Sequence, residues 1–135
     1  MTEKELCRKY VGVPYEHQGR TLEGLDCWGL IILAYREIGV EVLDLTDYDY
    51  DWAQQGDNHF VKNYYENWQR VEAPCFMDLL MFSNPLGIPY HAGIHLGYGR
   101  FLQCALRVGV VITPLDDKWR QRLYGVYRYV KDKDK

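Results

Sequence analysis

Cys27 is the residue whose type and position in this chain best suit covalent chemistry. It follows Asp26 and opens the apolar run CWGLIILA, where a glycine-rich loop turns into a helix that Gly39 ends. The N-terminus of a helix carries partial positive charge and unpaired N–H groups, which stabilise a thiolate and lower the pKa of a thiol. The pattern therefore predicts a nucleophilic thiolate, provided that a base lies nearby in space.

The base must come from elsewhere in the chain, and four histidines are available: His17, His59, His91 and His95. In a predicted strand over residues 91–96, alternation puts His91 and His95 on the face opposite the apolar side chains. In the next predicted strand, over residues 101–106, Gln103 lies on that same side, away from the driest face of the sheet. This argument does not choose between His91 and His95, and a simple hairpin register leaves His91 and Gln103 some residues out of alignment.

The same two histidines have the spacing H-x-x-x-H, which in a helix would suggest zinc. Here Ala92 follows the first histidine in place of the glutamate, and four strand residues separate the two rings by about 13 Å. The acidic run Asp47–Asp51 suggests calcium, but Trp52 and Asn58 stand where a calcium loop needs glycine and glutamate. We therefore expect no metal and no cofactor, and a solvated acidic loop in this region.

Length and composition restrict the remaining possibilities. We expect residues 1–130 to form a single domain and residues 131–135, alternating lysine and aspartate, to form a disordered tail. A net charge of −3 argues against nucleic-acid binding, and the apolar stretches are too short for membrane insertion. The polar N-terminus does not resemble a signal peptide, so we expect synthesis in the cytoplasm. Cys7, Cys75 and Cys104 form no C-x-x-C pair and are expected to be free thiols, most of them buried spacers.

Hydrophobic periodicity predicts an α+β fold in which a central helix that begins at Cys27 packs on an antiparallel sheet of about five strands. Gly29 inside this helix suggests close packing against another backbone. The predicted helices span residues 2–10, 27–38 and 58–70, and the predicted strands span residues 78–82, 91–96, 101–106, 110–113 and 123–130. Turns are expected at residues 97–100 and 107–109. Whether residues 41–72 form a lid over the site is left open.

Two blocks of this sequence resemble the NlpC family of cell-wall peptidases, which are papain-like thiol hydrolases. The first block is YVGVPYEHQGR at residues 10–20 with GLDCWGL at residues 24–30. The second is MDLLMF at residues 77–82 with HAGIHLG at residues 91–97 and GRFLQ at residues 99–103. The HQGR variant and the N-terminus without a signal resemble the branch found in bacteriophage tail-tip proteins.

The resemblance implies a papain-like fold, with Cys27 as nucleophile and His91, not His95, as general base. It implies that Tyr15 lies beside the cleft and that Gln103 takes the place of the second histidine that orients the first. A glutamine can accept a hydrogen bond from an imidazole but adds no charge. Met77 replaces the usual glycine before the aspartate of the second block, a departure that we expect to be structural.

This family likeness predicts hydrolysis of an amide bond in peptidoglycan stem peptides, between D-glutamate and a diamino acid, through a thioester on Cys27. Tyr15 and the helix N–H groups that follow Asp26 would hold the oxyanion, and Arg20 would bind a substrate carboxylate or play an ordinary surface role. The protein would act at the bacterial cell wall as part of a virion tail, alongside other tail proteins. Two alternatives remain: an inactive structural tail-assembly module on the same fold, and acyl transfer to an amine instead of water.

Overall fold

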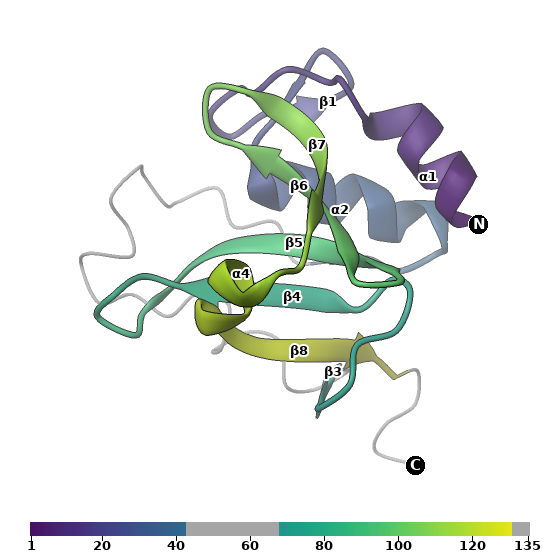
Figure 1. Cartoon of the computed structure of the whole chain (residues 1–135). Coiled ribbons are helices and arrows are strands. Elements are labelled where there is room, and N and C mark those ends of the chain that lie inside the picture. The colour runs from purple at the N-terminus through teal and green to yellow at the C-terminus, as the bar shows by residue number, and fades with distance from the viewer. Residues whose placement is uncertain (43–67, 131–135) are drawn as a thin grey trace.

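The computed structural model describes residues 1–42 and 68–130 and has helices in its first part and strands in its second. The elements follow in the order α1 (Glu3–Tyr10), β1 (Arg20–Thr21), β2 (Gly24–Leu25), α2 (Cys27–Glu37), β3 (Trp68–Val71), β4 (Leu79–Ser83), β5 (Pro89–Gly97), β6 (Arg100–Ala105), β7 (Gly109–Pro114), α4 (Asp117–Gln121) and β8 (Leu123–Tyr129). This arrangement confirms the predicted α+β class (Figure 1). The predicted strands begin and end within two residues of β4 to β8.

The main sheet has six strands in the order β3-β8-β4-β5-β6-β7, and every neighbouring pair is antiparallel. The expected number was about five, and β3 is the additional strand. The short β1 and β2 form a separate two-stranded ribbon directly before α2. Helix α2 contacts both the ribbon and strand β5, and in Figure 1 it lies between them.

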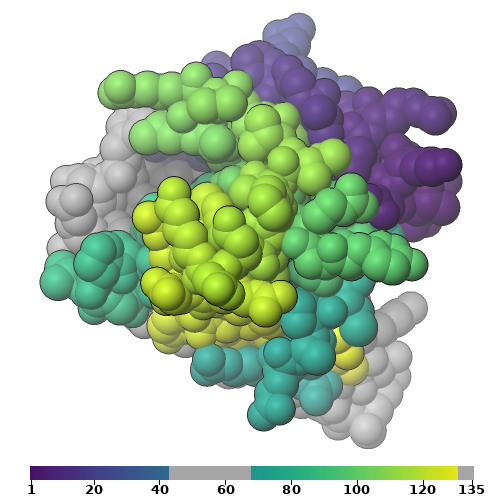
Figure 2. Space-filling model, in the orientation of Figure 1, coloured from purple at the N-terminus to yellow at the C-terminus, as the bar shows by residue number. Residues whose placement is uncertain are grey.

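Alternate residues of the strands face two different cores. Leu79 and Met81 of β4 belong to the larger core, which also contains the buried side chains of α2. Leu80 and Phe82 belong to a second core, against which Trp119 of α4 packs. The short helix α4 thus covers the face of the sheet opposite α2, and its segment occupies the centre of the surface in the space-filling view (Figure 2).

The prediction of a helix over residues 58–70 is wrong at its end, because Trp68–Val71 is strand β3, paired with β8. Trp68 is buried, and its ring makes edge contacts with the rings of Tyr35, at 5.2 Å, and Tyr129, at 5.6 Å. Tertiary packing of one large ring thus determines the strand. The rest of that predicted helix, the acidic run and the charged tail lie within residues 43–67 and 131–135, outside the described residues.

Helix α4 was not predicted, because five residues are too few to produce a helical period. Its N-cap is Asp116, whose side chain accepts a hydrogen bond from the backbone of Trp119 at 3.1 Å. In residues 1–42 and 68–130, no helix has the length and apolar character needed to cross a membrane.

The predicted turn between β5 and β6 is confirmed. Tyr98 and Gly99 both have positive φ angles, 55° and 71°, as a two-residue type I′ hairpin turn requires. This turn sets the register that brings β6 and its Gln103 alongside β5.

Candidate active site

Cys27 is the first residue of α2 and is half-buried at the point where the ribbon enters the helix. Asp26 caps the helix: its Oδ1 accepts from the N–H of Gly29 at 2.7 Å, and its Oδ2 accepts from the N–H of Gln18 at 2.9 Å. Since Asp26 holds both the helix and the preceding loop, it fixes the position of the thiol. The expected N-cap is confirmed.

Gly29 makes the close backbone approach that the sequence predicted. A Cβ atom at this position would lie 2.0 Å from the carbonyl oxygen of Gly19. The first turn of α2 therefore packs directly on the loop that precedes it, and any larger residue would push the two segments apart.

Arg20 binds a carboxylate, but the carboxylate is that of Asp26. Its Nη1 lies 2.9 Å from Asp26 Oδ1 and also donates to the carbonyl of Gly19 at 2.9 Å. The two charged side chains are 17% and 5% exposed, so this is a largely buried ion pair. Arg20 thus supports the loop that carries Cys27, and its contact with a substrate carboxylate stays a prediction.

The expected side-by-side placement of His91 and Gln103 is confirmed by a hydrogen bond of 2.8 Å between His91 Nε2 and Gln103 Oε1. The pairing of Ile94 with Leu102 shows how this contact forms. Continued along the strands, that register puts Gln103 two residues from the position opposite His91, and such diagonal neighbours are within reach of long side chains. The apparent misalignment is therefore bridged by the glutamine.

The same hydrogen bond determines which imidazole nitrogen carries the proton. An amide oxygen can only accept, so His91 donates from Nε2, and its Nδ1 keeps a lone pair. The amide nitrogen of Gln103 in turn donates to Thr113 Oγ1 at 2.8 Å. His91, Gln103 and Thr113 thus form a chain across β5, β6 and β7. Thr113 was not identified from the sequence, because its contact depends on the register of β6 with β7.

The sulfur of Cys27 lies beside β5, because the backbone N–H of Ala92 hydrogen-bonds to it and lowers the pKa of the thiol. Arg20 also lowers this pKa, whereas the Asp26 carboxylate raises it. Burial has the largest effect, and the outcome is a pKa of about 12 for Cys27. Burial thus opposes the thiolate that the helix N-terminus was expected to stabilise.

Burial also lowers the pKa of His91, against the effect of its hydrogen bond to Gln103. The imidazole packs among aromatic rings, with centroids 6.0 Å from Phe82 and 6.3 Å from Trp119. This face of the sheet is thus covered, although the sequence suggested that it was the wetter one. Burial therefore favours the neutral form of both Cys27 and His91.

Tyr15 precedes the ribbon and its backbone forms a bridge with Leu25, two residues before Cys27. Its half-buried side chain packs against the larger core. The structure therefore positions Tyr15 in the segment that leads to the thiol.

The other cysteines differ in their surroundings. Cys104 is buried, and its thiol donates to the carbonyl of Leu25 at 3.0 Å, so it supports the same segment from β6. Cys7 is half-buried, and Cys75 is exposed. The expectation of buried spacers is met by Cys104 and is wrong for Cys75.

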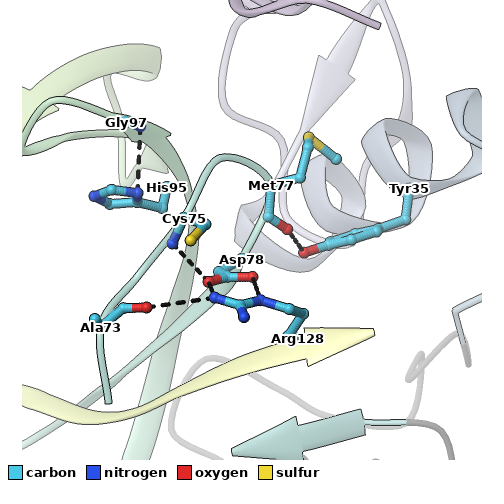
Figure 3. A network of polar contacts seen from close by, with 8 residues as sticks. All are labelled: Tyr35, Ala73, Cys75, Met77, Asp78, His95, Gly97 and Arg128. Atoms are coloured by element: carbon cyan, nitrogen blue, oxygen red, sulfur yellow. Dashed lines mark hydrogen bonds and ion pairs between the residues drawn. The ribbon is translucent and has the colours of Figure 1, made fainter. Parts of the chain in front are cut away.

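A polar network at the opposite end of α2 connects this helix to the sheet (Figure 3). The hydroxyl of Tyr35, in α2, donates to the carbonyl of Met77, and the N–H of Met77 donates to the carbonyl of His95, in β5. Arg128 of β8 binds both oxygens of the buried Asp78, at 2.9 and 2.7 Å. The network therefore holds together the helix that carries Cys27 and the strand that carries His91.

The backbone conformation of Met77 shows why glycine is usual at this position in the family. Its φ angle is +73°, a left-handed conformation that glycine adopts without strain. The expectation that this position is structural agrees with its place in the network, where both backbone polar groups are bonded.

Among residues 1–42 and 68–130, no group of three or more histidine, cysteine, aspartate or glutamate side chains is arranged to hold a metal ion.

Comparisons with known proteins place this chain in one protein family. The model of the NlpC/P60 family matches residues 12–128. The chain is 32% identical over 126 residues to the gamma-DL-glutamyl hydrolase of Bacillus subtilis, covering 90% of this chain and 27% of that protein. It is 28% identical over 133 residues to the tail tip assembly protein K of Escherichia phage lambda, covering 92% of this chain and 66% of that protein. The chain thus spans about a quarter and about two thirds of the lengths of these relatives.

A solved NlpC/P60 family protein from Bacillus cereus has the same fold. It superposes with a TM-score of 0.70 at 19% identity, covering 96% of this chain and 41% of that one. The phage relative agrees with the expected tail-tip branch.

Proposed function

Because this chain belongs to the NlpC/P60 family, we propose that it is a cysteine hydrolase that cleaves an amide bond in peptidoglycan stem peptides. Cys27 is the nucleophile, His91 is the general base, and Gln103 orients His91. The observation that carries the proposal is the 2.8 Å hydrogen bond from His91 to Gln103, in the strand whose Ala92 N–H contacts the Cys27 sulfur.

The reaction begins from a neutral thiol and a neutral imidazole. His91 Nδ1 takes the proton of Cys27 as the sulfur attacks the amide carbonyl, and the resulting imidazolium then protonates the leaving amine. Water, activated by the same imidazole, releases the acyl group from the thioester. Gly29 donates its N–H to Asp26, so the oxyanion is held by the N–H groups ahead of it in the first turn of α2 and by the Tyr15 hydroxyl.

The names of the relatives support the proposed substrate class. The Bacillus subtilis relative is named as a gamma-DL-glutamyl hydrolase, which supports a glutamyl bond as the cleaved bond. The diamino acid on the amine side of this bond is the partner that the family resemblance implies. The phage relative is named as a tail tip assembly protein, which supports action at the bacterial cell wall as part of a virion tail, with other tail proteins as partners.

A structural role in tail assembly on the same fold is the second candidate. Two observations favour it: the name of the phage relative, and the burial that raises the pKa of Cys27 to about 12. In this role the thiol would remain protonated and unreactive, and Cys27→Ala would be neutral.

Digestion of purified peptidoglycan distinguishes the two. Mass spectrometry should find new amino termini on diamino acids with the wild-type protein and none with Cys27→Ala or His91→Ala. The matched control is Cys75→Ala, because Cys75 is exposed and lies outside the proposed site. No cleavage by wild type, together with unimpaired tail assembly by Cys27→Ala, would favour the structural role. Transfer of the acyl group to an added amine would instead identify an acyltransferase.

A further inference from the structure

Trp119 of the short helix α4 packs on the face of the sheet that carries the His91 imidazole. Its ring centroid lies 5.1 Å from that of Phe82, 5.2 Å from that of Phe101 and 6.3 Å from that of the imidazole. Phe82 is also the residue of β4 that pairs with His91, and their rings are 6.0 Å apart. The indole therefore lies where β4, β5 and β6 bring these rings together.

Gly93, two residues after His91, leaves the room that this packing needs. A Cβ atom at Gly93 would lie 2.9 Å from a carbon of the Phe101 ring. Residues two apart in a strand share a face, so the Phe101 ring lies over the position next to His91. Trp119 packs on that ring and so reaches the imidazole.

Backbone hydrogen bonds fix the segment of α4 at both ends. The N–H of Leu115, before the helix, donates to the carbonyl of Gly99 in the turn between β5 and β6 at 2.7 Å. The N–H of Ser83, at the end of β4, donates to the carbonyl of Arg122 at 2.7 Å. The indole of Trp119 is thus held in place by the same strands that it covers.

We propose that Trp119 is a positioning residue that closes the α4 face of His91, so that the imidazole and its hydrogen bond to Gln103 stay away from water. The inference rests on the proposed function, since it assigns to Trp119 the task of maintaining the general base.

The order of burial makes Trp119 the outer wall of this cluster. Phe82 and Phe101 are fully buried, whereas Trp119 is half-buried and has a side towards the solvent. Burial lowers the pKa of His91, because a desolvated imidazole resists protonation. Truncation of the indole would admit water, which would solvate the imidazolium and compete with Gln103 for the proton on Nε2. The pKa of His91 should then rise towards its ordinary value.

In the described part of the chain, the titratable and charged groups near His91 remain when Trp119 is replaced. They are Cys27 in α2, Tyr90 in β5, whose ring centroid is 5.8 Å from that of the imidazole, and Arg122, whose guanidinium lies 5.4 Å from the centroid of the indole. The positive charge of Arg122 opposes an imidazolium in wild type and variant alike. A higher pKa in the variant would therefore report the entry of water and not the loss of a charge.

The test uses the full chain with ¹³C-labelled histidine, whose ring signals are followed by NMR from pH 4 to pH 8 without substrate. The His91→Ala spectrum identifies the signals of His91. In Trp119→Ala we expect the pKa of His91 to rise by about 0.5 pH unit or more, and kcat on peptidoglycan fragments to fall about tenfold with KM little changed. Trp119→Phe, which keeps an aromatic cover, should stay near wild type in both. If Trp119→Ala does not fold, Trp119→Leu should show a smaller rise in the same direction.

A matched variant separates covering from packing. Leu115 is 5% exposed and belongs to the same core, so Leu115→Ala should lower the stability in urea but leave the indole over His91 and the pKa unchanged. An unchanged or lower pKa of His91 in the Trp119 variants would overturn the proposal. So would an equal rise in Leu115→Ala, because any loosening of this core would then expose the imidazole.

The outcomes keep this inference apart from the proposed function. If Trp119→Ala raises the pKa of His91 but the wild-type protein cleaves no peptidoglycan, the covering role stands and the hydrolase proposal fails. If the wild type cleaves peptidoglycan and the pKa does not respond to Trp119→Ala, the hydrolase proposal stands and the covering role fails.

Discussion

Alkylation of Cys27 by iodoacetamide in the free protein should be slow at neutral pH and should accelerate steadily as the pH rises. Only the thiolate reacts, and burial raises the pKa of this thiol to about 12. The measurement is the rate of modification at each cysteine by peptide mass spectrometry, from pH 5 to pH 9, with free cysteine as the reference compound.

The expected magnitude follows from this pKa. At pH 7 a thiol with a pKa of about 12 is ionised in about one molecule in 10⁵, whereas free cysteine is ionised in about one in 30. The rate at Cys27 should therefore be about a thousandfold or more below that of free cysteine at pH 7. It should rise about tenfold for each pH unit, without a plateau below pH 9.

The same protonation states predict the behaviour of His91. Since the free thiolate does not depend on a neutral imidazole, His91→Ala should change the alkylation rate at Cys27 little. Hydrolysis does need the imidazole as a base, and burial lowers its pKa from an ordinary value of 6.5. The acidic limb of kcat/KM should therefore lie below pH 6.5.

One result would refute this reasoning. Rapid alkylation of Cys27 at pH 5 to 6, above the rate of free cysteine and abolished by His91→Ala, would mean that a thiolate–imidazolium pair already exists in the free protein. The helix N-terminus and the Ala92 N–H would then outweigh burial, and the attack would need no proton transfer.

Two further predictions concern the supports of the site. Arg128→Met should lower the free energy of unfolding by about 2–4 kcal/mol in urea titrations, since the 3%-exposed Asp78 loses its charged partner. Arg8→Met, at an exposed position, should change it by less than about 0.5 kcal/mol, and an equal effect of the two would contradict the role of the network. Gly29→Ala should cost at least about 2 kcal/mol in the same titrations, because the new methyl group would meet the Gly19 carbonyl. Wild-type stability for this variant would show that the two segments separate easily.

The sequence correctly predicted those features of the site that depend on helix capping and on hydrophobic periodicity. Cap chemistry and apolar periodicity placed Cys27 at a helix start, and Gly29 indicated the backbone contact with Gly19. Strand alternation placed His91 and Gln103 on one side of the sheet, where they form a hydrogen bond. These features depend on residues close in sequence or on the period of a single strand.

The parts that were missed depend on contacts between distant segments. Thr113 reaches Gln103 only because of the register between β6 and β7. The partner of Arg20 depends on how its short ribbon folds back on the cap, and strand β3 depends on the burial of Trp68. Such contacts leave no periodic signal in the sequence.

The surroundings of His91 were misjudged for the same reason that helix α4 was missed. Trp119 of α4 packs on Phe82 and Phe101 and lies against His91, so it closes the face of the sheet that the sequence suggested was open to water. Burial of the imidazole disfavours its charged form and so lowers the pKa of His91. The direction of the His91 pKa shift therefore could not be derived before the second core was known.

Neutral partners in the free protein are consistent with efficient chemistry under the proposed function. Charge then develops only during the attack, as the sulfur loses its proton to His91 and the carbonyl becomes an oxyanion. The oxygen of Gln103 stabilises the imidazolium more than the neutral ring, and the helix N–H groups stabilise the oxyanion more than the carbonyl. Interactions that strengthen only as charge appears lower the barrier without tightening the ground state. The burial that suppresses the free thiolate would thus also strengthen these fixed dipoles, because they act in a medium with little water to screen them.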